Sequence, residues 1–331
     1  MQHKITHFDR MMSKVDGVQT SLAPTNSTEA MDLAGLNFEV ARSGLYLDGE
    51  IPVSNRFQAI RRMDTNEVLG VVGPQYTPIQ NSDAFGILDH MDGIKFGRAG
   101  FFGFGETCFI QVDLGQENEV LKNDPVVSHA LVRTNHSGKK VVSFVLTPIR
   151  VICQNSLRAA LNKKNNFGHI KISHNSQSNE QIQEAKELIT WSKQSFGNYV
   201  EIFKNFASRE ITQAEAKMYV ESVVRPNKRK AYLEAEFNID PTNPYSLNNP
   251  YQDKDDPKAV QAILDLAASS KFRAKEGTLW GIYNAATEYF DHAKSFRPGS
   301  SAQAESHFGE SAMKSAAFDS AVAMLKRMAI D

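Results

Sequence analysis

The chain has 331 residues, of which 41% are hydrophobic and 23% are charged, with a formal net charge of −1. This composition indicates a globular protein with a buried core and excludes a chain that is disordered throughout. The near-zero net charge predicts no partner, so a charged binding surface has to come from uneven distribution along the sequence. Two cysteines, Cys108 and Cys153, exclude a disulfide-stapled secreted domain and favour a reducing compartment.

The N-terminal residues are polar, lack the apolar stretch of a signal peptide and show no periodicity. No run of roughly 18 apolar residues occurs anywhere, so we expect a cytoplasmic protein with no membrane partner. Residues 1–25 are expected to form a flexible arm, with an interaction tail as the alternative. A short helix is expected next over Glu29–Ala34, with Ser27 or Thr28 as its N-cap.

Residues 26–175 predict a β-rich α+β domain. Two pairs of apolar runs are each joined by a turn of Asn, Asp, Ser or Gly, which is typical of a hairpin: Phe57–Arg62 with Val68–Val72, and His129–Thr134 with Val141–Thr147. Further strands are expected over Phe38–Leu47 and Thr107–Leu114, and a helix over Asn81–Met91, capped by Asn81 or Ser82. In Thr107–Leu114, Cys108, Ile110, Val112 and Leu114 share one face, which predicts a half-buried strand.

Four glycines between Gly97 and Gly105 alternate with phenylalanines. The order G-x-G-x-x-G after a strand is absent, so the segment is no dinucleotide fingerprint. It predicts either a glycine-kinked strand whose Phe side chains fill the core, or exposed Phe101 and Phe102 rings on which unpaired bases stack.

After Cys153 the apolar period shifts towards 3.6, and residues 176–331 predict a mainly helical region packed on the β-rich half. Helices are expected from Leu157 and then over about 180–206, 212–224, 257–269, 278–293 and 310–328. A Pro- and Asn-rich stretch at 225–256 predicts a long loop. The fold class is therefore α+β, with an antiparallel N-terminal half.

The segment from Pro125 to Asn179 contains no Asp or Glu. A like-charged surface repels itself, and nucleic-acid phosphates are the partner that most often offsets this cost. The alternative is a set of cations spread over both faces of a sheet and neutralised by acids of the C-terminal half. The segment carries eight cations: Arg133, Lys139, Lys140, Arg150, Arg158, Lys163, Lys164 and Lys171.

Within this segment, Asn155 or Ser156 is expected to cap the helix that follows. The cap is either ordinary or, with two arginines nearby, an anion site. In the later helix, Asn284, Glu288 and His292 form a narrow polar strip. The strip either bonds to the β region and locks the helix against it, or lines a site. No second ligand pair with helical spacing accompanies Glu288 and His292, so no metal and no cofactor are expected.

Five segments occur in the order of the phage/plasmid-like protein family with domain of unknown function 932, which the chain resembles over about residues 30–325. They are Gly35–Val40, Val71–Asn81, Leu146–Leu157, Gly277–His292 and Ser306–Glu310. The resemblance implies a mobile genetic element, a phage or plasmid, in a bacterial cytosol. It supplies no catalytic residues.

We therefore expect a non-enzymatic, nucleic-acid-binding protein, active in single-strand DNA annealing or as a recombination accessory. Its partners would be single-stranded nucleic acid and further copies of itself, as a homo-oligomer. Signatures of hydrolases, kinases and deaminases are absent from the sequence. Two alternatives stay open. One is an enzyme with a site beside the Trp280–His292 helix, and the other is a host-interaction protein without DNA contact.

Overall fold

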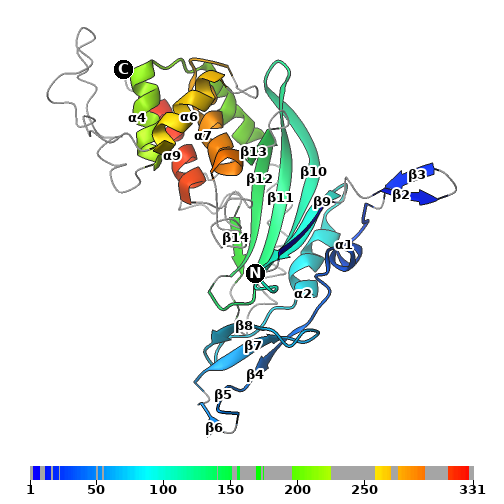
Figure 1. The fold of residues 1–331 in the computed structure, drawn as a ribbon. Coiled ribbons are helices and arrows are strands. Elements are labelled where there is room, and N and C mark those ends of the chain that lie inside the picture. Colours follow the sequence, from blue (N-terminus) through cyan, green and yellow to red (C-terminus); the bar gives the residue numbers. More distant parts are fainter. Residues whose placement is uncertain are drawn as a thin grey trace.

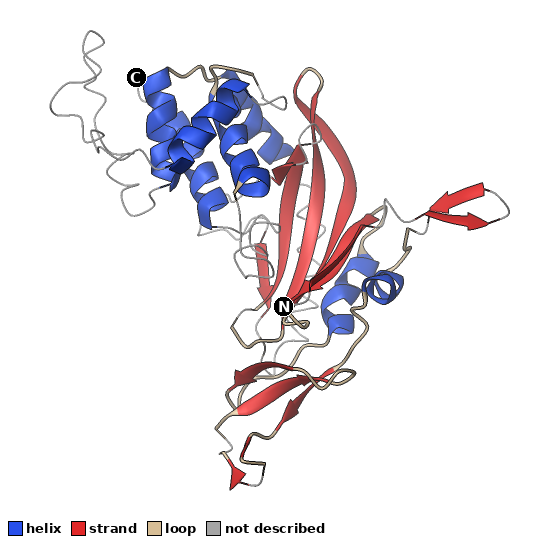
Figure 2. Ribbon diagram, in the orientation of Figure 1, coloured by secondary structure: helices blue, strands red, loops and turns tan. Residues whose placement is uncertain are grey.

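Antiparallel sheets form the N-terminal half of the chain and helices the C-terminal half, which confirms the α+β class (Figures 1 and 2). The structure is a computed structural model. It describes residues 3–7, 12–15, 18–21, 23–49, 51–53, 56–139, 141–150, 155–156, 169–172, 174, 196–224, 258–269, 275–294 and 312–327.

The largest sheet has the strand order β1-β9-β10-β11-β12-β13, and β14 also pairs with β12. All of its pairings are antiparallel, and the predicted hairpin around residues 135–138 is confirmed by the register of β11 against β12. The strands are β1 (His3–His7), β9 (Lys95–Phe102), β10 (Thr107–Leu121), β11 (Asp124–Asn135), β12 (Val142–Arg150), β13 (Asn155–Ser156) and β14 (His169–Ile172).

The first 25 residues differ from the flexible arm that the sequence predicts, because they contain three strands. β1 lies along β9 at the edge of the large sheet, and β2 (Met12–Val15) pairs with β3 (Val18–Ser21) as a separate hairpin. β1 approaches β9 closely at Gly100, where a Cβ atom would lie 1.9 Å from the Lys4 carbonyl oxygen. Only glycine permits this approach.

Two small sheets project from the large one. β4 (Val40–Ser43), β7 (Gln58–Arg62) and β8 (Val68–Val72) form a three-stranded sheet, which confirms the predicted β7–β8 hairpin. β5 (Tyr46–Leu47) and β6 (Ile51–Pro52) form a two-stranded sheet. The single strand expected over residues 38–47 is thus divided between β4 and β5.

Two short helices precede the long strands, and both N-cap predictions are wrong. α1 (Ser27–Ala34) is capped by Asn26, whose side chain accepts a 2.9 Å hydrogen bond from the Glu29 amide, because Ser27 bonds to Asp89 instead. α2 (Asn81–Phe85) continues into the 3-10 helix η2 (Gly86–His90) and follows Gln80. Asn81 is unavailable as a cap because its Oδ1 atom, the acceptor that a cap would use, is hydrogen-bonded to His136 Nε2 at 2.9 Å.

The C-terminal helices agree with the predicted spans to within a few residues where the structure describes them. Asn155 and Ser156 lie in β13, and the helix that one of them was expected to cap falls outside the described residues, so this cap stays a prediction. The helix expected from Leu157 and the whole loop at 225–256 lie outside the described residues. The helices are 196–208, α4 (Gln213–Val224), α6 (Lys258–Ser269), α7 (Leu279–Glu288), its π-helical continuation η3 (Tyr289–Ala293) and α9 (Ala312–Arg327). None of these helices is both long and apolar enough to cross a membrane.

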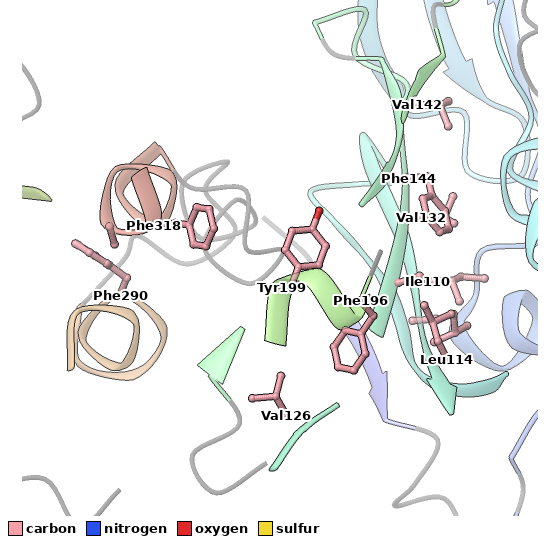
Figure 3. Close-up of a cluster of buried hydrophobic side chains, with 14 of the residues drawn as sticks. Ile110, Leu114, Val126, Val132, Val142, Phe144, Phe196, Tyr199, Phe290 and Phe318 are labelled. Carbon is pink, nitrogen blue, oxygen red and sulfur yellow. The ribbon is translucent and has the colours of Figure 1, made fainter. Parts of the chain in front are cut away.

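One hydrophobic core joins the two halves. Ile110, Val132 and Phe144 lie on one face of the sheet, while Phe290 and Phe318 come from the helices (Figure 3). Between the helices, the Phe203 ring packs against the fully buried Trp280, with 5.1 Å between the ring centroids. The Trp280 indole Nε1 donates a 2.9 Å hydrogen bond to Asp124 Oδ2, at the turn between β10 and β11.

We predict that Asp124→Ala lowers the free energy of unfolding by roughly 1–3 kcal/mol, because the buried indole N–H loses its acceptor. Urea unfolding followed by tryptophan fluorescence measures the loss. Asn118→Ala, at an exposed position of the same β10–β11 hairpin, is the control and should change stability by less than about 0.5 kcal/mol. Equal stability of the two variants would contradict this role of the bond.

Candidate functional site

The large sheet has one face that carries Ile110, Val132 and Phe144 and faces the core. Its opposite face, which we call the second face, carries a cavity of about 790 Å³. Its lining comes from four strands of the sheet and from the chain before α1. We call this cavity the groove. It is lined by His7, Ala23, Pro24, Thr25, Ile94, Lys95, Phe96, Gly97, Arg98, Gln111, Asp113, Val127 and His129.

The register of the strands explains why these side chains meet. Arg98 of β9 stands opposite His7 of β1 and opposite Gln111 of β10. Two residues further along β10, Asp113 stands opposite Lys95 on one side and His129 of β11 on the other. Because side chains on a strand alternate between faces, these two rows lie on one face of the sheet.

A β-bulge places both β9 cations in the groove. Lys95 and Arg98 are three residues apart, so regular alternation would put them on opposite faces. The register shifts between Gln111 and Val112: Arg98 pairs with Gln111 and Phe96 with Val112, which leaves Gly97 unpaired. The extra residue restores the two cations to one face, and a glycine inside a strand is typical of such a bulge.

Arg98 is the most deeply buried cation of the groove. Its Nε donates to Gln111 Oε1. Burial lowers the pKa of Arg98, and the Asp291 carboxylate of η3 opposes this shift. Asp291 also pairs with Lys314, which is fully buried on α9. The helical half therefore contributes a carboxylate to the charges around Arg98, and the guanidinium stays protonated at neutral pH.

His129 supplies the groove with a titratable ring. Burial lowers the pKa of His129, with Arg98 acting in the same direction, while Asp113 and the Val127 carbonyl raise it. The Nδ1 atom lies 3.5 Å from the Val127 oxygen. Among the described residues that line the groove, Asp113 is the only acidic side chain, against Lys95, Arg98 and two histidines. The arrangement favours an anionic ligand.

The structure describes the side chains of two of the eight cations that the sequence groups together, Arg133 and Lys139. Arg133 is buried on the second face of the sheet, opposite Ser143, whereas Lys139 is exposed in the β11–β12 turn. Arg150 and Lys171 lie in β12 and β14, but their side chains are outside the description. Lys140, Arg158, Lys163 and Lys164 also fall outside the described residues. A common basic surface of all eight therefore stays a prediction.

The two aromatic candidates are not alike. Phe102 is 3% exposed and packs with Phe109 and Leu131, which leaves no ring face for a base. Phe101 is partly buried against the core, and the Arg62 guanidinium lies 5.4 Å from the centre of its ring. This matches the glycine-kinked strand whose phenylalanines fill the core.

The polar strip of α7 and η3 has two buried residues and one exposed residue. Asn284 and Glu288 are buried, and the Asn284 amide donates to the Trp280 carbonyl, whereas His292 is exposed. None of the three lines the groove. In the described part of the chain, no three His, Cys, Asp or Glu side chains are grouped so as to hold a metal ion.

The sequence does not group the groove residues into one site, although Val127 and His129 both belong to the acid-free segment. His7 falls in the supposed flexible arm, and Lys95 and Arg98 share a face only through the bulge. Gly97 between two cations was the available signal. In the sequence Gly97 is simply the first glycine of the Gly97–Gly105 run, and its consequence for the faces of the strand follows only from the strand pairing.

A second polar cluster lies on the core-facing side of the sheet, around Cys108. The Asn81 amide donates to the Leu36 carbonyl, so its Oδ1 atom accepts from His136 Nε2, 2.9 Å away. The Cys108 thiol donates to the Gly105 carbonyl at 3.4 Å. The set has the residue types of a Cys-His-Asn catalytic triad. However, burial raises the pKa of Cys108, and both Cys108 and His136 are fully buried, so the thiol is protonated and inaccessible.

The sequence matches the family described as a domain of unknown function, DUF932, over residues 68–313. No curated protein and no solved structure matches the chain.

The buried histidines predict acid lability. Burial lowers the pKa of His136 to about 3 and that of His174, which stacks on Tyr76 at 4.7 Å, to about 4. Both values lie below the roughly 6.5 of an unfolded histidine. The neutral rings therefore stabilise the fold above pH ~6.5, and this contribution is lost as the pH falls towards 3–4, by about 1.4 kcal/mol per pH unit for each ring.

His174→Phe retains the stacking on Tyr76 and removes one titrating group. Urea unfolding between pH ~6 and ~4.5 should show a pH slope that is shallower by about 1.4 kcal/mol per pH unit. Tyr76→Phe, in the same cluster, should change the stability but keep the wild-type slope. A slope unaffected by His174→Phe would show that this ring is not buried in its neutral form.

Proposed function

The chain belongs to the DUF932 family, a description that assigns no activity, and from the chemistry of the groove we propose that it binds single-stranded nucleic acid without catalysing a reaction. The observation that carries the proposal is the convergence of Lys95, Arg98, His7 and His129, from three strands, on one cavity whose described lining contains a single acidic residue. A phosphate offsets the repulsion between Lys95 and Arg98.

The size and walls of the groove suit one nucleotide unit of a strand. Its volume of about 790 Å³ falls within the roughly 300–1,000 Å³ that small-ligand sites occupy. Ile94, Phe96 and Val127 supply an apolar wall beside the cations. A guanidinium fork and an apolar wall together bind a phosphate and its attached sugar and base.

The exposed Lys139 gives the bound strand a second contact. It lies in the turn beyond β11, ten residues along the chain from His129. At about 3.4 Å per residue this places it roughly 25–35 Å from the groove. A strand that leaves the groove along β11 would reach this turn and the neighbouring cations of the acid-free segment. The phage or plasmid setting and a role in annealing or recombination belong to this proposal and stay predictions.

We predict that Lys95→Glu weakens binding of a labelled oligothymidylate about tenfold, because one phosphate contact is replaced by repulsion. Fluorescence anisotropy at low and moderate salt measures both affinity and salt slope, and the slope should fall by about one contact. Lys139→Glu should act similarly. Lys258→Glu makes the same charge change at an exposed site on α6 and is the matched control.

The control should leave the dissociation constant within about twofold of the wild type. Binding that is indifferent to salt, or equal weakening by Lys95→Glu and Lys258→Glu, would contradict the proposal. In the first case the phosphates are not the recognised groups, and in the second only net charge matters.

A further inference from the structure

The small sheets of residues 40–72, which we call the β4–β8 arm, carry an unusual concentration of exposed apolar side chains. Among the residues that the structure describes, all eight large hydrophobic side chains that are exposed lie in this one stretch. They are Tyr46, Leu47, Ile51, Val53, Phe57, Met63, Val68 and Val71, with exposed fractions from 37% to 60%.

The β5–β6 hairpin at the end of the arm is too small to be stable by itself. β5 and β6 form a two-stranded ladder of two residues each, and an isolated two-stranded hairpin is at best marginally stable in water. Three of its four residues, Tyr46, Leu47 and Ile51, are 57–60% exposed apolar side chains. Covering them would remove apolar surface from water and stabilise the hairpin.

The exposed area fits a protein interface. The eight side chains together expose on the order of 700 Å². A standard interface buries roughly 800 Å² on each partner. The arm alone therefore offers nearly the area that a stable dimer needs.

The charges of the arm identify the kind of partner. No lysine occurs between Lys14 and Lys95, and residues 39–72 contain five acidic residues and four arginines. Lysine is depleted at protein interfaces, and it is also the residue that most often protects exposed strands from association. Anionic lipids and nucleic acids require a basic surface. A near-neutral apolar surface with both signs of charge is complementary to itself.

We propose that the β4–β8 arm is a self-association surface, on which the arm of a second copy of this chain docks around a two-fold axis. The two arms present the same patch to each other, as in an isologous dimer. Tyr46, Leu47 and Ile51 of each copy lie within the buried contact. The inference is independent of the groove, which is lined by other residues.

Light scattering coupled to size-exclusion chromatography tests the proposal on the full chain. The wild type should elute with twice the 36.9 kDa mass of one chain. Leu47→Lys combined with Ile51→Lys should elute with the mass of one chain, as should Val68→Lys combined with Val71→Lys on β8. All four positions are more than half exposed, so the substitutions cost the isolated chain little, and circular dichroism verifies that each variant is folded.

Gln213→Lys places a lysine at an exposed position of α4 and should keep the wild-type mass. A wild type that has the mass of one chain at concentrations well above about 10 µM would overturn the proposal, since interfaces of this size bind more tightly. Folded β5–β6 and β8 variants that both keep the dimer mass would overturn it as well.

Discussion

The pairing of β9 with β10 is the constraint on which the candidate site depends. The bulge at Gly97 brings Lys95 and Arg98 onto one face, and the register then sets Gln111 and Asp113 beside them. A regular strand would have sent one of the two cations into the apolar face that carries Cys108, Ile110 and Val112. The one extra residue of the bulge therefore keeps both cations on the groove face and away from the apolar face.

Arg98 links this sheet to the helices. A buried guanidinium is costly unless it is hydrogen-bonded and neutralised. Gln111 supplies a hydrogen bond, and Asp291, which also pairs with Lys314, supplies negative charge from the helical half. The bond from Trp280 to Asp124 is a second polar link between the same two parts. The groove thus depends on both halves of the chain, although the described lining comes from the N-terminal half.

Much of the fold was predictable because local signals decide it. The β7–β8 and β11–β12 hairpins have turn residues between alternating runs, and the apolar period of α4, α6, α7 and α9 fixes their spans. The helix caps were not predictable, because Ser27 and Asn81 bond to residues distant in sequence. β1 was missed because a five-residue edge strand is stabilised by its partner β9 rather than by its own pattern. The groove was not predictable because a bulge decides on which face of β9 the two cations lie, and the position of that bulge follows from the strand pairing and not from residue spacing.

Photocrosslinking of a single-stranded oligonucleotide carrying halogenated uracils, followed by mass spectrometry, tests the central claim most directly. If the groove holds the strand, crosslinked peptides should contain residues 94–98 of β9 or 127–129 of β11, and excess unlabelled strand should compete. Crosslinks confined to the helices or to the β4–β8 arm, with none at these two strands, would contradict it.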